Sequence, residues 1–501
     1  MISAGVPLPA PRDGRLILIK VPLSQVRHAA RMEPDIAAAH ARWNFDHALL
    51  QRYDRPGPRY TSYPTAPHFQ PGFGATELQA AFLRAQEQRP GRAVSLYVHV
   101  PFCSSPCFYC GCNRIITRDA SKGQAYVARL LREATSAAEH LERSRTVVQL
   151  HLGGGTPNFL SPALLGDLLD GLRRIFRFST DAGRDISIEL DPRAVQPDDI
   201  ATLAQIGFTR VSLGIQDFDP DVQAAINRRQ GEQETLELIA ACRQAGIASV
   251  NVDLVYGLPR QTQAGFARTL DRVLAARPDR LAIYGYAHLP HVFKAQKQID
   301  VQELPSAQDR LALLGLAVRT LSAAGYQYIG MDHFALPSED LAIAQRRGDL
   351  QRNFMGYTTH ANTDLIGLGV SAISHVGDSY SQNPRELAVW EAAVDRGALP
   401  VCRGMQLSAD DLLRAEVIQA LLCCGHVDLA AVAQRHQCDA RHCYDDALAA
   451  LEVLTADGLV EVRGLCVDVT ATGWPLVRLA AMCFDRYLQP SQQDVRYSKA
   501  I

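Results

Sequence analysis

Long hydrophobic runs and an excess of charge of either sign are both missing from this chain of 501 residues. Its 51 Lys and Arg nearly balance its 53 Asp and Glu, so the formal net charge is -2. This balance favours neither nucleic acid nor an anionic membrane as a partner. The longest apolar stretch near the N-terminus, residues 16–19, is broken by Lys20 and Pro22 and resembles neither a membrane span nor a signal peptide. We therefore expect a soluble, cytoplasmic protein with no membrane span.

The length and composition indicate a globular enzyme of several domains. Hydrophobic residues make up 47% of the chain and charged residues 21%, as in ordinary globular proteins, and the length exceeds that of one typical domain. We expect a flexible N-terminal extension over residues 1–42, an N-terminal segment over 43–90, a catalytic barrel over 91–400 and a C-terminal helical and hairpin domain over 401–501. The sequence leaves open whether translation starts at Met1 or at Met32.

Three cysteines lie within eight residues in the run CSSPCFYC, at Cys103, Cys107 and Cys110. No fourth cysteine completes a regular four-cysteine cage. Three thiolates can hold three irons of a [4Fe–4S] cluster and leave the fourth iron open to an outside ligand. An open iron beside bound S-adenosylmethionine can pass one electron into it and cleave it to a carbon radical.

Other roles for these cysteines are less favoured but remain open. A zinc site would need a matching second ligand element, and none lies nearby in the sequence. The thiols could also be unligated. A disulfide is disfavoured because clustered cysteines in a chain without a secretory signal more often bind metal or catalyse.

From about residue 94 the chain alternates short β-branched runs with helical patterns. Apolar residues recur at helical spacing from Val127 to Leu141, and Ser161 before Pro162 predicts a helix start. This alternation predicts an α/β fold of parallel βα units, wound as a barrel or partial barrel with its chemistry at the carboxyl ends of the strands. The predicted strands are residues 94–100, 148–152, 185–190, 210–215, 250–255 and 281–286.

Polar or glycine-rich motifs follow the ends of these strands. The run GGGTP at residues 153–157 can let a ligand approach the backbone, although it could be only a turn. Glu189 and Asp191 can accept hydrogen bonds from ribose hydroxyls, with a capping or salt-bridge role as the alternative. Gln216 and Asp253 end the next strands, and Arg228 lies where a cation could meet a carboxylate. Together they predict a ring around a polar ligand.

The chain changes character after about residue 406. Ser408 and Asp411 predict a helix start with a capping box, and two alternating runs around Gly464 predict a hairpin. Helices with a hairpin indicate a smaller, mostly helical, winged-helix-like domain. Residues 406–475 contain four Arg, no Lys and eleven Asp or Glu, a charge of the wrong sign for binding phosphates. We therefore expect a lid or packing domain over the barrel mouth.

Thiols and imidazoles in this C-terminal region could bind a second metal, but they have no repeated ligand spacing, and cysteine is a common core residue. A structural role is therefore favoured for the whole set. Its members are Cys423, Cys424, His426, Cys438, His442 and Cys443.

Nine segments carry a resemblance to one known family: RPGPRYTSYPTA at residues 55–66, YVHVPFCSSPCFYCGCN, HLGGGTPNFL, IELDPR, LGIQDF, NVDLVYGLP, YAHLP, YIGMDHFA and GLGVSAIS. They resemble the oxygen-independent coproporphyrinogen III oxidases, also called coproporphyrinogen dehydrogenases, which are radical S-adenosylmethionine enzymes of haem biosynthesis. The likeness runs from about Trp43 to the C-terminus. It implies a partial (β/α)6 barrel, one [4Fe–4S] cluster and two S-adenosylmethionine sites.

The resemblance also implies roles for individual residues. Cys103, Cys107 and Cys110 match the cluster ligands, whereas Cys112 matches a family cysteine that is not a ligand. Tyr109 stands where the family often has Phe, and its hydroxyl needs a partner if it is buried. The first S-adenosylmethionine site is matched by Tyr97, Gly154, Glu189 and Ile373. The second is matched by Tyr109, Gly155, Thr156, Gln216, Arg228, Asp253 and Ala287.

The implied reaction is oxidative decarboxylation of two propionates of coproporphyrinogen III to vinyl groups, which gives protoporphyrinogen IX. Because the chemistry is radical, we assign no general acid or base. Arg59 and Arg114 are candidates to bind the substrate's carboxylates. The resemblance implies an electron donor and an acceptor that the sequence does not identify, and we expect a monomer that binds no nucleic acid.

A sister group of this family provides the competing hypothesis. Its members share the barrel and the cysteine spacing but act as haem-binding chaperones. They lack the cysteine of the CGC element and differ in the RYTSYPT region. This chain has both Cys112 and residues 59–65 of that region, which favours the enzyme, although a shared fold does not fix function.

Overall fold

A computed structural model describes residues 47–488, and its centre is a sheet of thirteen strands. Seven neighbouring strands of this sheet run parallel, and six of them are the predicted strands, so this prediction is confirmed. The first and third have the predicted bounds. The seven are β1 (Val94–Val100), β4 (Thr146–Gly154), β6 (Asp185–Leu190), β7 (Arg210–Gln216), β8 (Ser249–Tyr256), β9 (Arg280–Gly285) and β14 (Asp364–Leu368).

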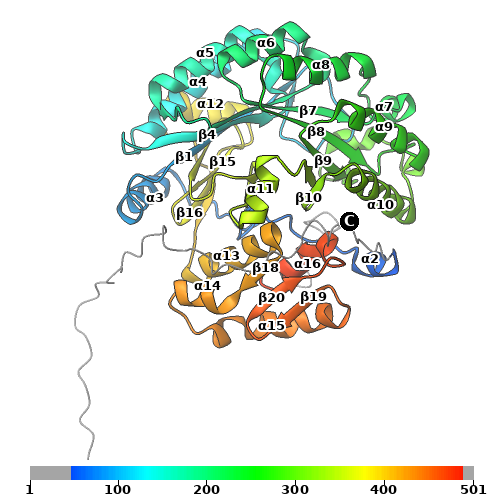
Figure 1. Ribbon diagram of the computed structural model, residues 1–501. Helices are drawn as coiled ribbons and strands as arrows, with labels where there is room; N and C mark the ends of the chain where they lie inside the picture. Colours follow the sequence, from blue (N-terminus) through cyan, green and yellow to red (C-terminus); the bar gives the residue numbers. More distant parts are fainter. Residues whose placement is uncertain (1–46, 489–501) are drawn as a thin grey trace, which may run out of the picture.

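The predicted partial barrel is confirmed, because the strands follow one another around a curved sheet whose outer side is covered by helices (Figure 1). The helix at Ser161 begins as predicted, since the Ser161 hydroxyl accepts a hydrogen bond from the Leu164 N–H at 3.3 Å. The covering helices are α4 (Ser121–Ala138), α5 (Pro162–Ile175), α6 (Pro197–Ile206), α7 (Pro220–Ala225), α8 (Glu232–Gln244), α9 (Gln263–Ala276) and α10 (Ala307–Ala323).

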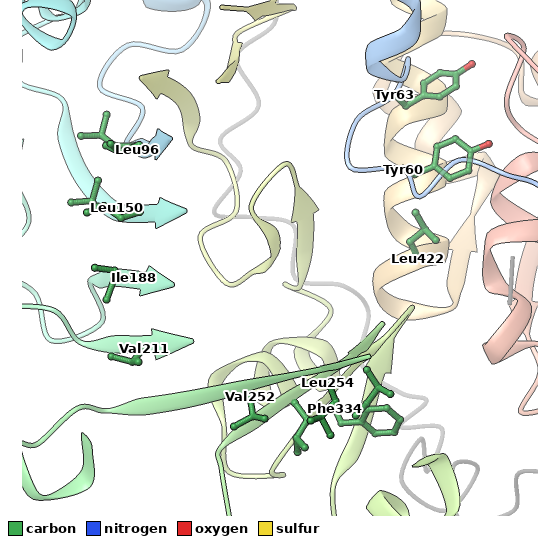
Figure 2. Close-up of a cluster of buried hydrophobic side chains, with 14 of the residues drawn as sticks. Tyr60, Tyr63, Leu96, Leu150, Ile188, Val211, Val252, Leu254, Phe334 and Leu422 are labelled. Carbon is green, nitrogen blue, oxygen red and sulfur yellow. The ribbon is translucent and has the colours of Figure 1, made fainter. Parts of the chain in front are cut away.

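Alternation along the strands separates a hydrophobic layer from the barrel interior. Leu96, Leu150, Ile188 and Val211 lie on four neighbouring strands and are 2% exposed or less (Figure 2). Successive side chains of a strand point to opposite faces, so the residue that follows each of them faces the interior. These four followers are Tyr97, His151, Glu189 and Ser212. The sheet therefore builds its core on the helix side and a polar surface on the other side.

The sheet continues beyond the parallel strands on both sides, which the sequence did not predict. Antiparallel strands follow β14 on one side and β9 on the other. They are β15 (Ile373–Val376), β16 (Ser379–Gln382) and β17 (Arg403–Gln406), and β11 (His333–Ala335) and β10 (Gln327–Gly330). The remaining short strands are β5 (Arg177–Phe178), β2 (Phe102–Cys103), β3 (Ile115–Ile116), β12 (Gln351–Asn353) and β13 (Gly356–Thr358).

The C-terminal region forms the predicted helical and winged-helix-like unit. The capping box is present, because Ser408 Oγ accepts from the Asp411 N–H at 3.1 Å and Asp411 accepts from the Ser408 N–H at 2.9 Å. The predicted hairpin is also present, and a third strand joins it. The unit comprises α13 (Ala409–Cys424), β18 (His426–Asp428), α14 (Leu429–Arg435), α15 (Ala440–Ala456), β19 (Val460–Arg463), β20 (Cys466–Val469) and α16 (Val477–Met482).

One hydrophobic cluster joins the barrel, the C-terminal unit and the N-terminal segment. The Tyr60 hydroxyl donates to Asp485 at 2.8 Å, and Tyr63 Oη accepts from the Arg486 N–H at 3.1 Å. The C-terminal unit is therefore packed onto the barrel. Other helices are α2 (His47–Tyr53), α3 (Ala75–Gln88), α11 (Asp340–Arg347) and α12 (Leu387–Asp395), with short 3₁₀ helices η2 (Ala66–His68), η3 (Pro157–Phe159), η4 (Pro192–Ala194), η5 (Lys294–Gln298), η6 (Val301–Glu303) and η7 (Trp474–Leu476).

Three of the expectations from the sequence stay predictions. The extension over residues 1–42 and the alternative start at Met32 lie outside the described residues, and the domain boundaries stay predictions. Across residues 47–488 no helix is both long and apolar enough to span a membrane.

Buried ion pairs tie together the amino ends of the strands, opposite the end where chemistry is expected. Asp364, at the start of β14, is 1% exposed and accepts hydrogen bonds from Arg92 at 3.0 Å, from Arg145 and from the Gly377 N–H at 3.1 Å. Asp185, which begins β6, pairs with Arg210 at 3.0 Å. In barrels this end contributes to stability rather than to catalysis.

Candidate active site at the carboxyl ends of the strands

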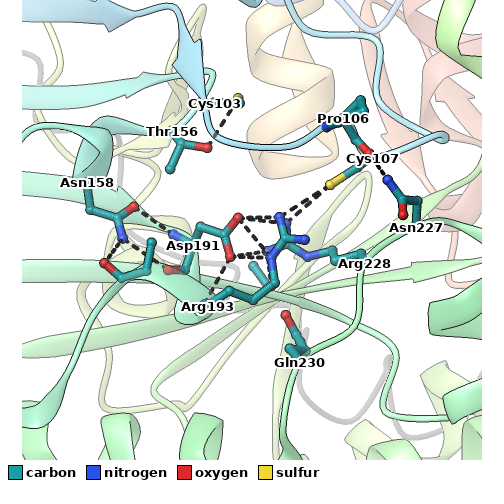
Figure 3. Close-up of polar contacts among 12 residues, drawn as sticks. Cys103, Pro106, Cys107, Thr156, Asn158, Asp191, Arg193, Asn227, Arg228 and Gln230 are labelled. Carbon is teal, nitrogen blue, oxygen red and sulfur yellow. Dashed lines mark hydrogen bonds and ion pairs between the residues drawn. The ribbon is translucent and has the colours of Figure 1, made fainter. Parts of the chain in front are cut away.

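The three clustered cysteines lie in the segment that follows β1, where Cys103 ends the short strand β2, and we call residues 103–112 the cysteine loop. Cys103 and Cys107 are each 8% exposed. The Thr156 hydroxyl donates to Cys103 Sγ at 3.3 Å, and Cys107 Sγ accepts from Arg228 at 3.5 Å and from Arg193 at 3.6 Å (Figure 3). Donors of this kind stabilise thiolate sulfur, which is the form that binds iron.

Cys110 completes the set in a more accessible position. Its sulfur accepts a hydrogen bond from the Cys112 N–H at 3.4 Å. Hydrogen bonding by the Cys112 side chain lowers the pKa of Cys110 to about 6, whereas burial raises the pKa of Cys103 to about 11. A buried thiol of this kind is deprotonated when a metal binds it, so the donor set fits an iron–sulfur cluster.

No three His, Cys, Asp or Glu side chains within residues 47–488 converge on a point where one ion could be held. The thiolates of a cluster bind separate irons, so their sulfurs need not converge on one point. The C-terminal cysteines and histidines are likewise not gathered into such a group in the described part of the chain.

Hydrogen bonds from remote loops hold the cysteine loop in place. Asn227 donates through Nδ2 to the Pro106 carbonyl at 2.7 Å, and the Phe108 N–H donates to the Ile226 carbonyl at 2.9 Å. Arg114, a candidate for substrate binding, donates instead to the Cys107 carbonyl at 3.0 Å. The loop is therefore fixed by the segment before α8 as well as by its own residues.

Gln296, on η5, connects the cysteine loop to the loop after β9. It is 2% exposed and donates through Nε2 to the carbonyls of Tyr109 at 2.9 Å and Ala287 at 3.1 Å. Its Oε1 accepts from the Leu289 N–H at 2.5 Å. Tyr109 and Ala287, both expected at the second S-adenosylmethionine site, are thus brought together by a residue that the sequence did not single out.

The Tyr109 ring is half-buried beside a small apolar cluster that includes Ile226 and Tyr286. Burial raises the pKa of Tyr109 well above its usual value. Within the described part of the chain its hydroxyl makes no hydrogen bond to another side chain or to the backbone.

The glycine run lies where β4 ends, and two of its members need glycine. Gly154 has φ +118°, and a Cβ there would lie 2.7 Å from the His99 ring. A Cβ on Gly155 would lie 2.6 Å from the Pro101 carbonyl oxygen. The Gly154 N–H donates to Glu189 at 3.3 Å. The run therefore brings its backbone against both the residues that lead into the cysteine loop and the predicted carboxylate, as a ligand-binding turn requires.

Polar side chains of β1, β4 and β6 that point into the barrel interior form a row across these strands. Tyr97 pairs across the strands with His151, and their rings stack with centroids 6.0 Å apart. His151 Nε2 donates to Glu189 at 3.1 Å. Ile373 of β15 lies next to this row. Gly367 is the partner of Tyr97 on β14, and it packs so closely against Ile373 that a Cβ on it would lie 2.5 Å from the Ile373 carbonyl oxygen. The residues expected at the first S-adenosylmethionine site therefore lie on adjoining strands.

Asp253 and Gln216 extend the row along β8 and β7. Asp253 accepts from Ser212 at 3.0 Å and from Asn251 at 2.8 Å. Burial, followed by the charge of Glu189, raises the pKa of Asp253 to about 6. Gln216 is 8% exposed and ends its strand with φ +68°, a left-handed conformation that is uncommon outside glycine.

Asp191 lies between two arginines instead of facing a free ligand position. It accepts from Arg193 at 2.6 Å and from Arg228 at 3.1 Å, and it also caps η4 by accepting from the Arg193 N–H (Figure 3). These arginine charges and hydrogen bonds outweigh burial and lower the pKa of Asp191 to about 2. The geometry supports the salt-bridge and capping alternative for Asp191, and it confirms that Arg228 meets a carboxylate.

Comparison with known proteins supplies the family. The Radical SAM superfamily profile matches residues 97–273, and the HemN C-terminal domain profile matches residues 407–476. A protein of Pseudomonas aeruginosa named oxygen-independent coproporphyrinogen III oxidase is 46% identical over 460 residues, covering 92% of this chain and 99% of its own. The protein of that name from Escherichia coli K12 is 45% identical over 458 residues, covering 91% of this chain and 99% of its own.

A solved structure agrees with this similarity. The coproporphyrinogen III oxidase of Escherichia coli, described as a radical SAM enzyme, superposes with a TM-score of 0.84 at 44% sequence identity, covering 89% of this chain and 99% of that one. The chain belongs to the oxygen-independent coproporphyrinogen III oxidase family.

Several residues that shape the site of this oxidase family member were not found from the sequence. Asn227 and Gln296 act through contacts between remote loops, His99 of β1 contacts the Asn113 carbonyl, and Arg193 reaches Cys107 from η4. His151 had a local signal, since it stands between two apolar residues of a buried strand. A polar residue in such a position faces the opposite side of the sheet from its neighbours.

Proposed function

We propose that this chain catalyses the oxygen-independent conversion of coproporphyrinogen III to protoporphyrinogen IX in haem biosynthesis. The observation that carries the proposal is the cysteine triplet at the carboxyl end of β1, surrounded by thiolate-stabilising donors. Its support is the similarity, over nearly the full length of both chains, to relatives that bear this enzyme's name. Each of two propionates loses carbon dioxide, one hydrogen atom and one electron, and becomes a vinyl group.

We assign a [4Fe–4S] cluster to Cys103, Cys107 and Cys110, and two S-adenosylmethionine molecules to the surrounding polar groups. When bound, these cofactors supply a carbon radical that removes the hydrogen atom from the propionate β-carbon. Tyr97, Gly154, Glu189 and Ile373 are proposed to hold the first molecule. Tyr109, Gly155, Thr156, Gln216, Arg228, Asp253 and Ala287 are proposed to hold the second.

The contribution of the protein is to bind, orient and exclude water. Glu189 already accepts from the Gly154 backbone and from His151, so its carboxylate is held in one orientation for further donors such as ribose hydroxyls. The Arg193 and Arg228 guanidinium groups hold positive charge against the Cys107 sulfur. Fixed groups of this kind bring the reacting atoms together without reorganisation.

The partners and location follow from this activity as further parts of the proposal. A one-electron donor must reduce the cluster, and a separate acceptor must take the electron that remains after decarboxylation. We propose that the enzyme works as a monomer in the cytoplasm.

An anaerobic assay tests the function. The cluster-reconstituted protein is incubated with dithionite, S-adenosylmethionine and coproporphyrinogen III, and both products are measured. Joint appearance of protoporphyrinogen IX and 5′-deoxyadenosine supports the enzyme. Cleavage of S-adenosylmethionine without porphyrinogen turnover, combined with tight haem binding, would instead place the chain with the haem chaperones.

Gln296→Ala is expected to weaken the cofactor site, because it leaves two partly buried carbonyls and one N–H without their shared partner. We expect about tenfold lower activity, as for other residues that support metal ligands indirectly, and faster loss of iron in air. Iron content against time measures the second effect. Gln298→Ala is the matched control, since Gln298 lies on the same η5 helix and is exposed. Equal iron loss in both variants would contradict this role.

Binding of S-adenosylmethionine is expected to weaken as the pH falls, because the ionised Asp253 accepts a hydrogen bond from a further hydroxyl more strongly than its protonated form does. With its pKa raised to about 6, lowering the pH from 7.5 to 5.5 reduces the ionised fraction about fourfold. Folding favours the protonated form, so this group stabilises the fold at low pH and loses that contribution as the pH rises through about 6. Anaerobic equilibrium dialysis measures the affinity. Asp253→Asn should bind weakly with a flat profile between these pH values, and a wild-type slope in that variant would refute the assignment.

A further inference from the structure

Three arginines meet between the barrel and the C-terminal unit, and we call them the arginine cluster: Arg59, Arg352 and Arg478. They come from the N-terminal segment, from β12 and from α16. Arg352 Nε donates to the Arg59 carbonyl at 3.3 Å, and Arg478 donates to the Gly57 carbonyl at 3.1 Å. The cluster thus joins three parts of the chain that are remote in sequence.

Arg352 is the member whose charge the fold leaves uncompensated. The residue is 4% exposed, and its guanidinium lies over the Tyr357 ring at 4.8 Å, directly across the β12–β13 hairpin. Gln419 of α13 bonds both its backbone N–H and its carbonyl. Across residues 47–488, Nη1 is buried without a hydrogen-bond partner and no carboxylate forms an ion pair with Arg352. Buried arginine is costly in this state and is normally paired.

Aromatic rings and an imidazole line the same region. His333 packs between Tyr284 and Tyr357, with ring centroids 5.9 Å and 5.3 Å away, and its buried Nδ1 has no hydrogen-bond partner within the described range. The three rings form a row with His333 in the middle. Arg352 lies over Tyr357 at one end, and Arg59 lies 5.8 Å from the Tyr284 ring at the other end. Two guanidinium groups and an imidazole nitrogen without a hydrogen-bond partner in the described range therefore lie next to these aromatic rings.

The positive charges of Arg59 and Arg352 act on each other and on the groups beside them. Burial, then the charges of Arg478 and Arg352, lowers the pKa of Arg59 to about 9. Burial and then Arg352 and Arg59 lower the pKa of His333 well below its usual value. Asp332 forms an ion pair with Arg59, whose side chain keeps 33% of its surface accessible. Within residues 47–488, Asp332 pairs with Arg59 and no carboxylate pairs with Arg352, so an added anion would relieve the repulsion between these two guanidinium groups.

The cluster adjoins the proposed cofactor site. Tyr284 lies on β9 opposite Val255, two residues beyond Asp253. Figure 2 places Tyr60, the neighbour of Arg59, beside α13 and across from the barrel strands. A molecule that extends from the strand ends toward the C-terminal unit therefore meets Arg59 and Arg352.

We propose that Arg59 and Arg352, with His333 Nδ1 as a third polar contact, form a subsite for a carboxylate arm of the tetrapyrrole substrate. Arginine suits this ligand because its planar guanidinium binds a carboxylate through two parallel hydrogen bonds. The inference rests on the proposed function, since coproporphyrinogen III carries four propionates, of which two are converted and two are kept. Anchoring a distant carboxylate fixes the reacting carbon near the radical.

The test measures binding separately from chemistry. Reconstituted wild type, Arg352→Gln, Arg352→Lys and Arg174→Gln are titrated by fluorescence with coproporphyrin III and with its tetramethyl ester in the same detergent buffer. Arg174 is an exposed arginine of α5 and serves as the matched control. Cleavage of S-adenosylmethionine by dithionite without porphyrinogen reports that the fold and cofactor site are intact. Steady-state KM for coproporphyrinogen III is measured alongside.

Arg352→Gln is expected to raise the Kd of the free acid and the KM about tenfold to a hundredfold, to lose the preference for acid over ester, and to keep the porphyrinogen-independent cleavage. Arg352→Lys should recover part of the preference. If Arg352→Gln keeps the wild-type Kd and the wild-type preference for acid over ester, the subsite is wrong. Turnover by the wild type would still support the enzyme function in that case. A wild type that neither binds the porphyrin nor turns over the porphyrinogen would overturn both. If Arg352→Gln misfolds and therefore loses the porphyrinogen-independent cleavage of S-adenosylmethionine, the same measurements on Arg59→Gln decide the proposal by the same criteria.

Discussion

Cys107→Ala is expected to abolish both 5′-deoxyadenosine and protoporphyrinogen IX formation under anaerobic assay. Two thiolates cannot hold three irons of a cluster, and the two arginine donors that converge on the Cys107 sulfur would face a methyl group instead. The loss is therefore expected to extend to cleavage without substrate, and iron analysis after reconstitution should show an incomplete cluster.

Cys402→Ala provides the control for this result. Cys402 is exposed, lies between β16 and β17 and has no part in the proposed site. It should keep full iron content and full turnover. If Cys107→Ala retained a full complement of iron and cleaved S-adenosylmethionine at the wild-type rate, the assignment of the three cluster ligands would be wrong.

Asp364→Asn is expected to reduce the free energy of unfolding by about 3–5 kcal/mol, because it leaves the buried Arg145 and the partly buried Arg92 without their carboxylate. Asp364 holds Arg92, Arg145 and the Gly377 N–H at the amino end of β14. Since this end of the barrel is remote from the proposed chemistry, the folded variant should retain its KM values. Chemical denaturation followed by circular dichroism measures the loss.

Asp170→Asn is the matched control for the stability measurement. Asp170 pairs with Arg173 at 3.3 Å on the surface of α5, and its side chain is 64% exposed. Exposed pairs of this kind contribute about 0–1 kcal/mol. A loss in Asp364→Asn no larger than in this control would mean that the buried pair does not stabilise the fold.

The parallel strands could be predicted from the sequence because each is a short β-branched run buried on the helix side. β14 was not predicted, although it pairs with β1 along five residues. Its segment contains Gly367, and its partner lies far away in the sequence, so no local pattern identifies the pairing. Local sequence also could not reveal the antiparallel strands that extend the sheet, since these depend on edges created by the barrel itself.

Some residues of the candidate site could likewise be predicted from local sequence, and others could not. Glu189 and Asp253 could be predicted as polar groups at strand ends, and the geometry places them near one another. Asp191, three residues after a buried isoleucine, could have taken either of two roles, and only the positions of Arg193 and Arg228 decide between them. Gln296 has no distinctive neighbours in sequence, because its function depends on three backbone groups from two other loops.

The contacts of the N-terminal segment with the C-terminal unit have a consequence for the order in which the molecule is assembled. Tyr60 and its partner Asp485 are separated by 425 positions. During synthesis the strands of the barrel emerge and can pair while residues 53–63 still await their partners at the far end of the chain. Contacts of such long range form late in folding. Arg59 is therefore expected to take its place last, so that a ribosome must finish nearly the whole protein before the proposed carboxylate subsite is complete.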